Sequence, residues 1–128
     1  MPEILLIDDD EFMLTLIQSC LQEGGFTVVT TADGPQGIEL YARHKPAAVI
    51  LDLGLPSMDG LQVLKRIREI DGDAKVLVVT GYPSVAASEA AHALGARDFL
   101  AKPFDPEALL TNVQAIVPGT DPRNAPSP

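Results

Sequence analysis

The chain has 128 residues, a length that fits one domain, and 46% of them are hydrophobic, which is enough to form a core. Eighteen Asp and Glu residues against nine Lys and Arg residues give a formal net charge of −9. Such an acidic domain is a poor match for nucleic acid, because the phosphate backbone is bound through clustered Lys and Arg side chains.

Two further features of the sequence bear on where the protein works. No segment approaches the roughly 20 apolar residues of a membrane span, and residues 1–3 lack the basic stretch of a signal peptide. The only cysteine, Cys20, excludes an intrachain disulfide, and its place on the apolar face of a predicted helix indicates a small buried hydrophobe. We therefore expect a cytoplasmic protein with no membrane partner and no direct contact with nucleic acid.

Strand-like and helix-like segments alternate along the chain. Helices are indicated by apolar residues that recur on one face, and strands by short runs of β-branched and Leu residues. Asp10, Ser84 and Asp105 suit helix N-caps, and Gly24 and Gly95 suit helix ends. In chain order, the predicted elements are strand 4–7, helix 11–23, strand 27–31, helix 35–44, strand 47–51, a helix around 61–67, strand 75–80, helix 84–94, strand 99–101 and helix 106–117.

This alternation predicts the fold class. Five strands and five helices in turn favour an α/β fold with a doubly wound five-stranded parallel sheet, because right-handed crossovers place helices on both faces. The unbroken apolar run 47–51 suits a central strand covered on both sides. Residues 1–117 form one predicted domain. Residues 118–128 hold four prolines and no apolar pattern, so we expect a flexible tail or the start of an interdomain linker there.

Polar side chains stand where the predicted strands end. The acidic run Asp8–Asp10 follows the first strand, and Asp52 follows the third. Thr80 closes the fourth strand, and Lys102 follows the fifth. The carboxyl ends of parallel strands meet at one edge of a sheet, so we expect these carboxylates, the hydroxyl and the ammonium to converge. Such a set of groups can bind Mg²⁺ and a phosphoryl group.

The converging carboxylates need a compensating cation. Two unit charges about 4 Å apart repel by about 4 kcal/mol at an effective dielectric of about 20. Mg²⁺ prefers oxygen ligands and uses one or two carboxylates while it keeps several waters. We expect Asp9 and Asp52 to bind Mg²⁺ directly and Asp8 to bind it through water, with the backbone carbonyl of Gly54 as a further ligand. In the alternative interpretation, Asp8–Asp10 only caps the following helix.

The remaining polar residues suit phosphoryl transfer. Asp52 ends a buried strand, and a carboxylate so positioned can attack phosphorus and form an aspartyl-phosphate. The hydroxyl of Thr80 can donate to a phosphoryl oxygen, and the ammonium of Lys102 is a point charge suited to a phosphate. The Lys102–Pro103 bond is a candidate cis peptide. Together these residues predict a phosphoacceptor site in which Asp52 is the nucleophile.

Four motifs, in their order along the chain, resemble those of a known family. They are Leu-Ile-Asp-Asp-Asp at 6–10, Asp-Leu-Gly-Leu-Pro-Ser-Met-Asp-Gly at 52–60, Val-Thr-Gly at 79–81 and Ala-Lys-Pro-Phe at 101–104. Over about residues 3–117, the chain resembles the receiver domain of two-component response regulators, of the chemotaxis-regulator type. The resemblance implies a flavodoxin-like sheet with strand order 2-1-3-4-5.

The resemblance also implies a mechanism. Asp52 would be phosphorylated by the phosphohistidine of a sensor histidine kinase or phosphotransfer protein, or by a small acyl phosphate, while Asp8 and Asp9 hold Mg²⁺. Thr80 would then move towards the phosphoryl group, and Phe99, which stands where the family often has Tyr, would turn into the vacated space. The surface of the last two helices and last strand would change shape, control an output domain or downstream protein, and offer a contact for a homodimer formed on phosphorylation.

Three rival functions disagree with the residues of this chain. A Mg²⁺-dependent phosphatase with an aspartate nucleophile usually carries a second Asp two residues later, where this chain has Gly54. A nucleotide-binding domain needs a glycine-rich first turn, whereas residues 8–11 are all acidic. A degenerate receiver used only as a scaffold would have lost key residues that are present here. We expect no activity on an external substrate, only self-phosphorylation and slow dephosphorylation. By the resemblance, Gly54 and Tyr82 occupy positions that influence how water reaches the phosphoryl group, and the bulk of Tyr82 would slow hydrolysis.

Overall fold

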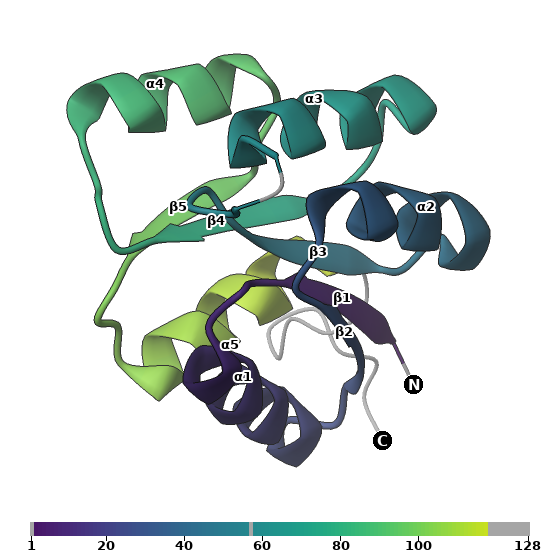
Figure 1. Cartoon of the computed structure of the whole chain (residues 1–128). Helices are drawn as coiled ribbons and strands as arrows, with labels where there is room; N and C mark the ends of the chain where they lie inside the picture. Colours follow the sequence, from purple (N-terminus) through teal and green to yellow (C-terminus); the bar gives the residue numbers. More distant parts are fainter. Residues whose placement is uncertain (1, 57, 118–128) are drawn as a thin grey trace.

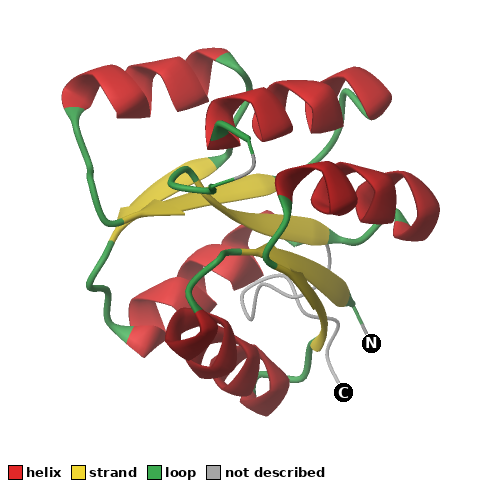
Figure 2. Ribbon diagram, viewed as in Figure 1, coloured by secondary structure: helices red, strands yellow, loops and turns green. Residues whose placement is uncertain are grey.

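The structure is a computed structural model that describes residues 2–56 and 58–117. The tail or linker expected at 118–128 lies outside the described residues. Strands and helices alternate as predicted (Figures 1 and 2). The strands are β1 (Glu3–Ile7), β2 (Thr27–Thr31), β3 (Ala48–Asp52), β4 (Val76–Thr80) and β5 (Asp98–Ala101). The helices are α1 (Glu11–Glu23), α2 (Gly34–His44), α3 (Gly60–Ile70), α4 (Val85–Ala93) and α5 (Pro106–Ile116).

The five strands form one parallel sheet in the order β2-β1-β3-β4-β5, which confirms the predicted topology. All residues of β3 and β4 are buried, as the apolar run in the centre of the sheet indicated. One detail differs from the expectation: Asp52 is the last residue of β3, where it pairs with Val79, instead of following the strand. The sheet itself therefore fixes the backbone of Asp52.

Helices cover both faces of the sheet, with α2, α3 and α4 on one side and α1 and α5 on the other (Figure 1). Alternate residues of a strand point to opposite faces, so β1 contributes to two cores. Leu5 and Ile7 pack with α2 to α4, whereas Ile4 and Leu6 pack with α1 and α5. These side chains are at most 2% exposed, and full burial of each contributes about 1.5–3 kcal/mol.

The predicted helix starts are confirmed by their caps. The carboxylate of Asp10 accepts hydrogen bonds from the backbone N–H groups of Phe12 and Met13, and the hydroxyl of Ser84 and the carboxylate of Asp105 act in the same way for α4 and α5. Each cap satisfies N–H groups that have no partner inside the helix. Because α1 starts at Glu11, the segment 8–10 between β1 and α1 is kept short.

The expectation for Cys20 is corrected. Its side chain is half-buried rather than fully buried, because it lies between α1 and α5, where its thiol lies 3.4 Å from the carbonyl oxygen of Pro106. Burial raises the pKa of this thiol above its ordinary value, and the charge of Glu23 raises it further. Within the part of the chain that the structure describes, no helix is both long enough and apolar enough to cross a membrane.

Candidate functional site

Three carboxylates gather at the carboxyl edge of the sheet. Asp8 follows β1 directly, Asp9 is the next residue, and Asp52 ends β3, the neighbour of β1. Oxygen atoms of these carboxylates all lie within 4.8 Å of one another. Asp8 and Asp52 are only 1% and 7% exposed, whereas Asp9 is exposed. The predicted convergence of Asp8 and Asp9 with Asp52 is therefore confirmed, whereas the carboxylate of Asp10 caps α1.

Lys102, which follows the edge strand β5, also contacts this cluster. Its ammonium donates to Oδ2 of Asp8 at 2.9 Å and to Oδ2 of Asp52 at 3.3 Å, and its side chain is 14% exposed. The backbone N–H of Lys102 donates to the carbonyl oxygen of Thr80 at 2.8 Å, which continues the pairing of β5 with β4. The Lys102–Pro103 bond is cis, as the sequence suggested. The site thus spans four neighbouring strands.

Backbone N–H groups orient the two buried carboxylates. Oδ1 of Asp8 accepts from the N–H of Asp10 at 2.9 Å, and Oδ1 of Asp52 accepts from the N–H of Gly54 at 3.1 Å. Each carboxylate therefore has one oxygen on the backbone and the other on Lys102. Both oxygens of each buried carboxylate therefore have a hydrogen-bond partner.

Burial, hydrogen bonds and neighbouring charges shift the pKa values of Asp8 and Lys102. Burial raises the pKa of the Asp8 carboxyl above its ordinary value, and the charge of Asp52 also raises it, although the N–H of Asp10 and the ammonium of Lys102 favour the charged form. For Lys102, burial acts to lower the pKa, but the hydrogen bonds and charges of Asp8 and Asp52 outweigh it and raise the pKa. Lys102 therefore carries its positive charge at neutral pH.

Two of the three clustered aspartates, Asp9 and Asp52, line a cavity of about 450 Å³. It is lined by Asp9, Asp10, Asp52, Gly54, Gly81, Tyr82 and Lys102. Asp10, the last residue of the acidic run, caps α1 and also lies on the cavity wall beside Asp9. The side chain of Tyr82 is 88% exposed at the rim. Since a water molecule takes about 30 Å³ in the liquid, the cavity has room for a hydrated cation and a phosphoryl group.

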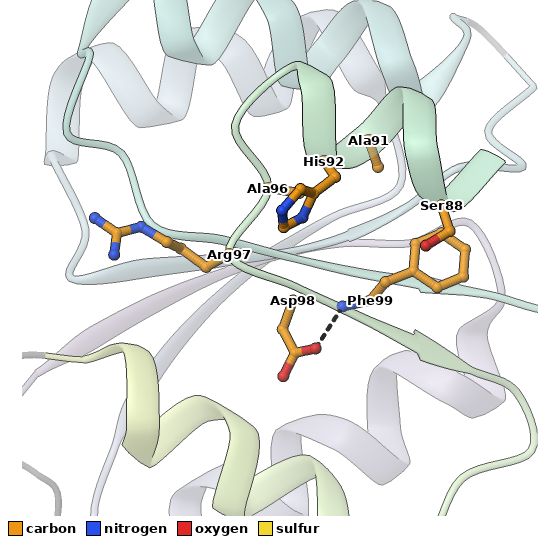
Figure 3. A pocket seen from close by; sticks show the side chains of 7 residues that line it. All are labelled: Ser88, Ala91, His92, Ala96, Arg97, Asp98 and Phe99. Carbon is orange, nitrogen blue, oxygen red and sulfur yellow. Dashed lines mark hydrogen bonds between the residues drawn. The ribbon is translucent and has the colours of Figure 1, made fainter. Parts of the chain in front are cut away.

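Among the described residues, Thr80 and Phe99 do not line this cavity. Thr80 ends β4 at the same edge of the sheet, and its buried hydroxyl accepts from the N–H of Tyr82 at 3.1 Å. Phe99 is half-buried on β5 and, together with Ser88 of α4, lines a separate cavity of about 250 Å³ (Figure 3). His92 and Arg97 also line that second cavity. Thr80 therefore lies near the cluster, while Phe99 lies at a distinct surface between α4 and β5.

The donor set fits a hard divalent cation. Asp8, Asp9 and Asp52 offer carboxylate oxygens within 4.8 Å of one another, and Gly54 lines the same cavity. Mg²⁺ and Ca²⁺ prefer oxygen ligands, and Mg²⁺ binds through one or two carboxylates plus water and substrate phosphates. The exposed Asp9 gives this set an open side, which an all-protein cage would lack.

Comparison with known proteins places the chain in a family. The family described as "Response regulator receiver domain" matches residues 4–114. Response regulator MprA of Mycobacterium sp. (strain KMS) is 36% identical over 123 residues, which cover 96% of this chain and 54% of that protein. Chemotaxis protein CheY of Bacillus subtilis (strain 168) is 37% identical over 108 residues, which cover 84% of this chain and 90% of that protein. This chain thus spans about half the length of MprA.

Solved structures agree with this comparison. The CheY-like receiver domain protein from Methanospirillum hungatei JF-1 superposes with a TM-score of 0.87 at 27% identity, covering 90% of this chain and 92% of that chain. A response regulator from Burkholderia pseudomallei, described with a phosphorylated aspartic acid, calcium ion and citrate, has a TM-score of 0.82 at 30% identity and covers 89% of this chain and 67% of that chain. With the fold, the acidic cluster and the sequence matches in agreement, the chain belongs to the family of receiver domains of two-component response regulators.

Proposed function

We propose that Asp52 is the phosphoacceptor of this receiver domain. The observation that carries the proposal is the position of its carboxylate, held between the N–H of Gly54 and the ammonium of Lys102, within reach of two further carboxylates and facing a cavity. A carboxylate fixed in this way is oriented for attack before a donor arrives. The donor is the phosphohistidine of a sensor histidine kinase or phosphotransfer protein, or a small acyl phosphate.

The transfer exchanges one bond to phosphorus for another. An oxygen of the Asp52 carboxylate forms a bond to phosphorus, and the bond from phosphorus to the histidine nitrogen breaks, so that its electron pair stays on the imidazole. Asp8, Asp9, Asp52 and the carbonyl oxygen of Gly54 would hold Mg²⁺ at this position. When bound, Mg²⁺ supplies Lewis-acid stabilisation of the negative charge that gathers on the phosphoryl oxygens.

Lys102 and Thr80 would bind the phosphoryl group on Asp52. A phosphoryl group carries a charge of about −1.5 to −2 and offers strong acceptor oxygens. The Lys102 ammonium, now shared by Asp8 and Asp52, would turn towards the greater negative charge. The hydroxyl of Thr80 lies one strand away and is bound only to the N–H of Tyr82 among its described contacts, so it is able to follow.

The movement of Thr80 would reach the α4–β5 surface through Phe99. Phe99 pairs with Val78 on β4, two residues before Thr80, and its ring borders the cavity beside α4 (Figure 3). When Thr80 moves inward, the ring can turn into the vacated space, and the surface of α4, β5 and α5 changes shape.

The switch also sets a free-energy requirement. To move the ratio of active to inactive conformations from about 1:99 to about 99:1, the phosphoryl group must favour the active state by about 5.5 kcal/mol. The changed surface would control an output domain or downstream protein, and would offer a homodimer contact.

The site is poorly suited to the hydrolysis of an external phosphomonoester. Gly54 stands two residues after Asp52, so that position offers no carboxyl group to act as a general acid for a leaving group. We infer that the domain, comprising residues 1–117 and working in the cytoplasm, catalyses only its own phosphorylation and slow dephosphorylation. It would act without contacting nucleic acid, since the chain carries a net charge of −9.

Intact-protein mass spectrometry tests this function. Incubation with acetyl phosphate and Mg²⁺ should add one phosphoryl group to the wild-type chain, and chelation of Mg²⁺ should prevent the addition. Asp52→Asn should remain unlabelled under the same conditions. Labelling of this variant at the wild-type rate would refute the assignment of Asp52, and turnover of an added phosphomonoester would favour a phosphatase instead.

A further inference from the structure

The start of α3 approaches the segment after Asp52 too closely for any side chain to fit. A Cβ atom placed on Gly60 would lie 2.4 Å from the Cα of Leu53 and 2.7 Å from the carbonyl oxygen of Asp52. Both are backbone atoms, so neither can turn aside as the end of a side chain can. The N–H of Gly60 also donates to the carbonyl oxygen of Leu53 at 3.3 Å, which ties the first residue of α3 to this segment.

Space, rather than backbone conformation, requires glycine at this position. The glycines with positive φ in the described part of the chain are Gly25 and Gly95, so the conformation of Gly60 is open to alanine. Gly60 is nevertheless buried, and the nearest atoms are those that lead directly out of the phosphoacceptor strand. A methyl group at Gly60 would have to push Leu53 away from α3.

The segment that would be displaced, Leu53 and Gly54, holds backbone groups of the phosphoacceptor site. The N–H of Gly54 donates to Oδ1 of Asp52 at 3.1 Å, and Gly54 lines the acidic cavity. A shift of Leu53 would move both the N–H and the carbonyl of Gly54 relative to the carboxylates of Asp8 and Asp9. β3 would still hold the backbone of Asp52, because Asp52 pairs with Val79 in the sheet.

We propose that Gly60 is a positioning residue for the phosphoacceptor site, an inference that rests on the proposed function. The missing side chain lets α3 dock onto the carbonyl of Asp52 and the Cα of Leu53. This docking fixes the path from Asp52 to Gly54 and so holds the carboxylate and the Gly54 carbonyl in place for Mg²⁺ and phosphoryl transfer. Gly60 touches neither ligand and acts only through this backbone.

The test compares Gly60→Ala with a matched variant elsewhere. A Cβ on Gly24 would lie 2.6 Å from Cδ1 of Leu110, between α1 and α5, so Gly24→Ala adds the same methyl group at a helix contact but meets the movable end of a side chain and leaves Asp52 and Leu53 untouched. Mg²⁺ affinity is measured by calorimetry and the free energy of unfolding by urea titration, both without any phosphodonor. Gly60→Ala should weaken Mg²⁺ binding by about 10-fold to 100-fold, as loss of outer support for metal ligands typically does.

Gly24→Ala should keep the wild-type Mg²⁺ affinity even if it loses as much stability as Gly60→Ala. Equal weakening of Mg²⁺ binding in both variants would show a general effect of stability and overturn the proposal. A folded Gly60→Ala protein with wild-type Mg²⁺ affinity would overturn it as well. Failure of the wild-type chain to bind Mg²⁺ or accept a phosphoryl group would instead refute the proposed function.

A double variant separates backbone crowding from side-chain packing. The Cβ on Gly60 would also lie 3.0 Å from Cδ2 of Leu53, a contact that Leu53→Ala removes while the two backbone contacts remain. The double variant Gly60→Ala/Leu53→Ala should therefore bind Mg²⁺ as weakly as Gly60→Ala. Recovery of the wild-type affinity would place the effect in the Leu53 side chain and overturn the proposal.

A measurement on the wild-type chain decides the case if Gly60→Ala does not fold. Hydrogen exchange reports whether the N–H of Gly60 stays bound to the Leu53 carbonyl in the absence of Mg²⁺. The proposal requires protection of this amide both with and without Mg²⁺, because the docking must exist before the ligand arrives. Exchange at the rate of an unprotected amide in the Mg²⁺-free chain would overturn it.

Discussion

The ammonium of Lys102 lies 2.9 Å from Oδ2 of Asp8, a residue 94 positions earlier in the chain. The same ammonium lies 3.3 Å from Oδ2 of Asp52, so one cation holds two buried carboxylates before any ligand arrives. A divalent cation must compete with Lys102 for these oxygens, whereas a phosphoryl group on Asp52 would draw the ammonium away from Asp8. The Lys102–Asp8 pair is therefore the contact that we expect phosphorylation to change first.

Replacement of Lys102 should strengthen the binding of Mg²⁺. In Lys102→Ala, the ammonium no longer competes for Asp8 and Asp52, so the affinity for Mg²⁺ should rise by about tenfold, which corresponds to about 1.4 kcal/mol. The variant should still accept a phosphoryl group but should lose the response of the α4–β5 surface. Calorimetry with Mg²⁺ measures the first effect, and Lys65→Ala, at an exposed position of α3, is the control. Complete loss of Mg²⁺ binding would contradict the role given to Lys102.

Removal of the Thr80 hydroxyl should separate phosphorylation from the switch. Thr80→Val retains the shape of the side chain but cannot donate to a phosphoryl oxygen, whereas Thr80→Ser can. The lost bond to the N–H of Tyr82 should cost about 1 kcal/mol of stability or less, since Tyr82 is exposed and water can replace the hydroxyl. NMR of the Phe99 ring on addition of beryllofluoride, the activating group in the DrrB receiver domain structure, measures the switch. A wild-type response of Phe99 in Thr80→Val would contradict the coupling.

The side chain of Tyr82 should control the lifetime of the phosphoryl group. Tyr82 lines the acidic cavity and is 88% exposed. Tyr82→Ala opens the approach of water, so hydrolysis of the aspartyl-phosphate should become faster by up to about tenfold, or about 1.4 kcal/mol of barrier. Tyr82→Phe keeps the ring and should keep the wild-type rate. Time courses of intact mass after removal of acetyl phosphate give both rates, and slower hydrolysis in Tyr82→Ala would count against this role.

A contact between α2 and the end of α3 should make stability depend on pH. The N–H of Asp73 and the buried hydroxyl of Tyr41, at 2.8 Å, both donate to the Asp71 carboxylate and lower its pKa below the ordinary value of 3.8. Because the folded pKa is the lower one, this stabilisation is fully present above 3.8 and is lost as the pH falls through the folded pKa.

Urea unfolding of Asp71→Asn and of the wild-type chain measures this effect. The variant should be less stable at neutral pH, and the difference from the wild type should shrink as the pH falls below 3.8. Glu39→Gln is the control, because its ion pair with Arg43 is exposed and should contribute little. A difference that grows towards acid pH would contradict the assignment.

The fold and the cluster could be predicted because both follow from the positions of strand ends. Apolar runs fix where parallel strands stop, and parallel strands stop at the same edge, so residues as distant as Asp8, Asp52 and Lys102 had to meet. The caps at Asp10, Ser84 and Asp105 were also predictable, since they depend on a residue type at a helix start.

Features that depend on how closely two elements approach could not be predicted. Periodicity assigned Cys20 to the inner face of α1, but next to Pro106 at the start of α5 its side chain is only half-buried. The bond from the Tyr82 N–H to the Thr80 hydroxyl is set by the turn after β4, and the narrow gap at Gly60 by the docking of α3. Sequence pattern identifies the face that a residue occupies, whereas these distances depend on packing in three dimensions.

The most direct test of the account is to map the phosphoryl group. Reduction with borohydride converts an aspartyl-phosphate into homoserine, which peptide mass spectrometry locates in the chain. After incubation with acetyl phosphate and Mg²⁺, we predict homoserine at position 52 and aspartate unchanged at positions 8, 9 and 10. Homoserine at position 8 or 9, or its absence from a chain that has gained a phosphoryl group, would contradict the central claim.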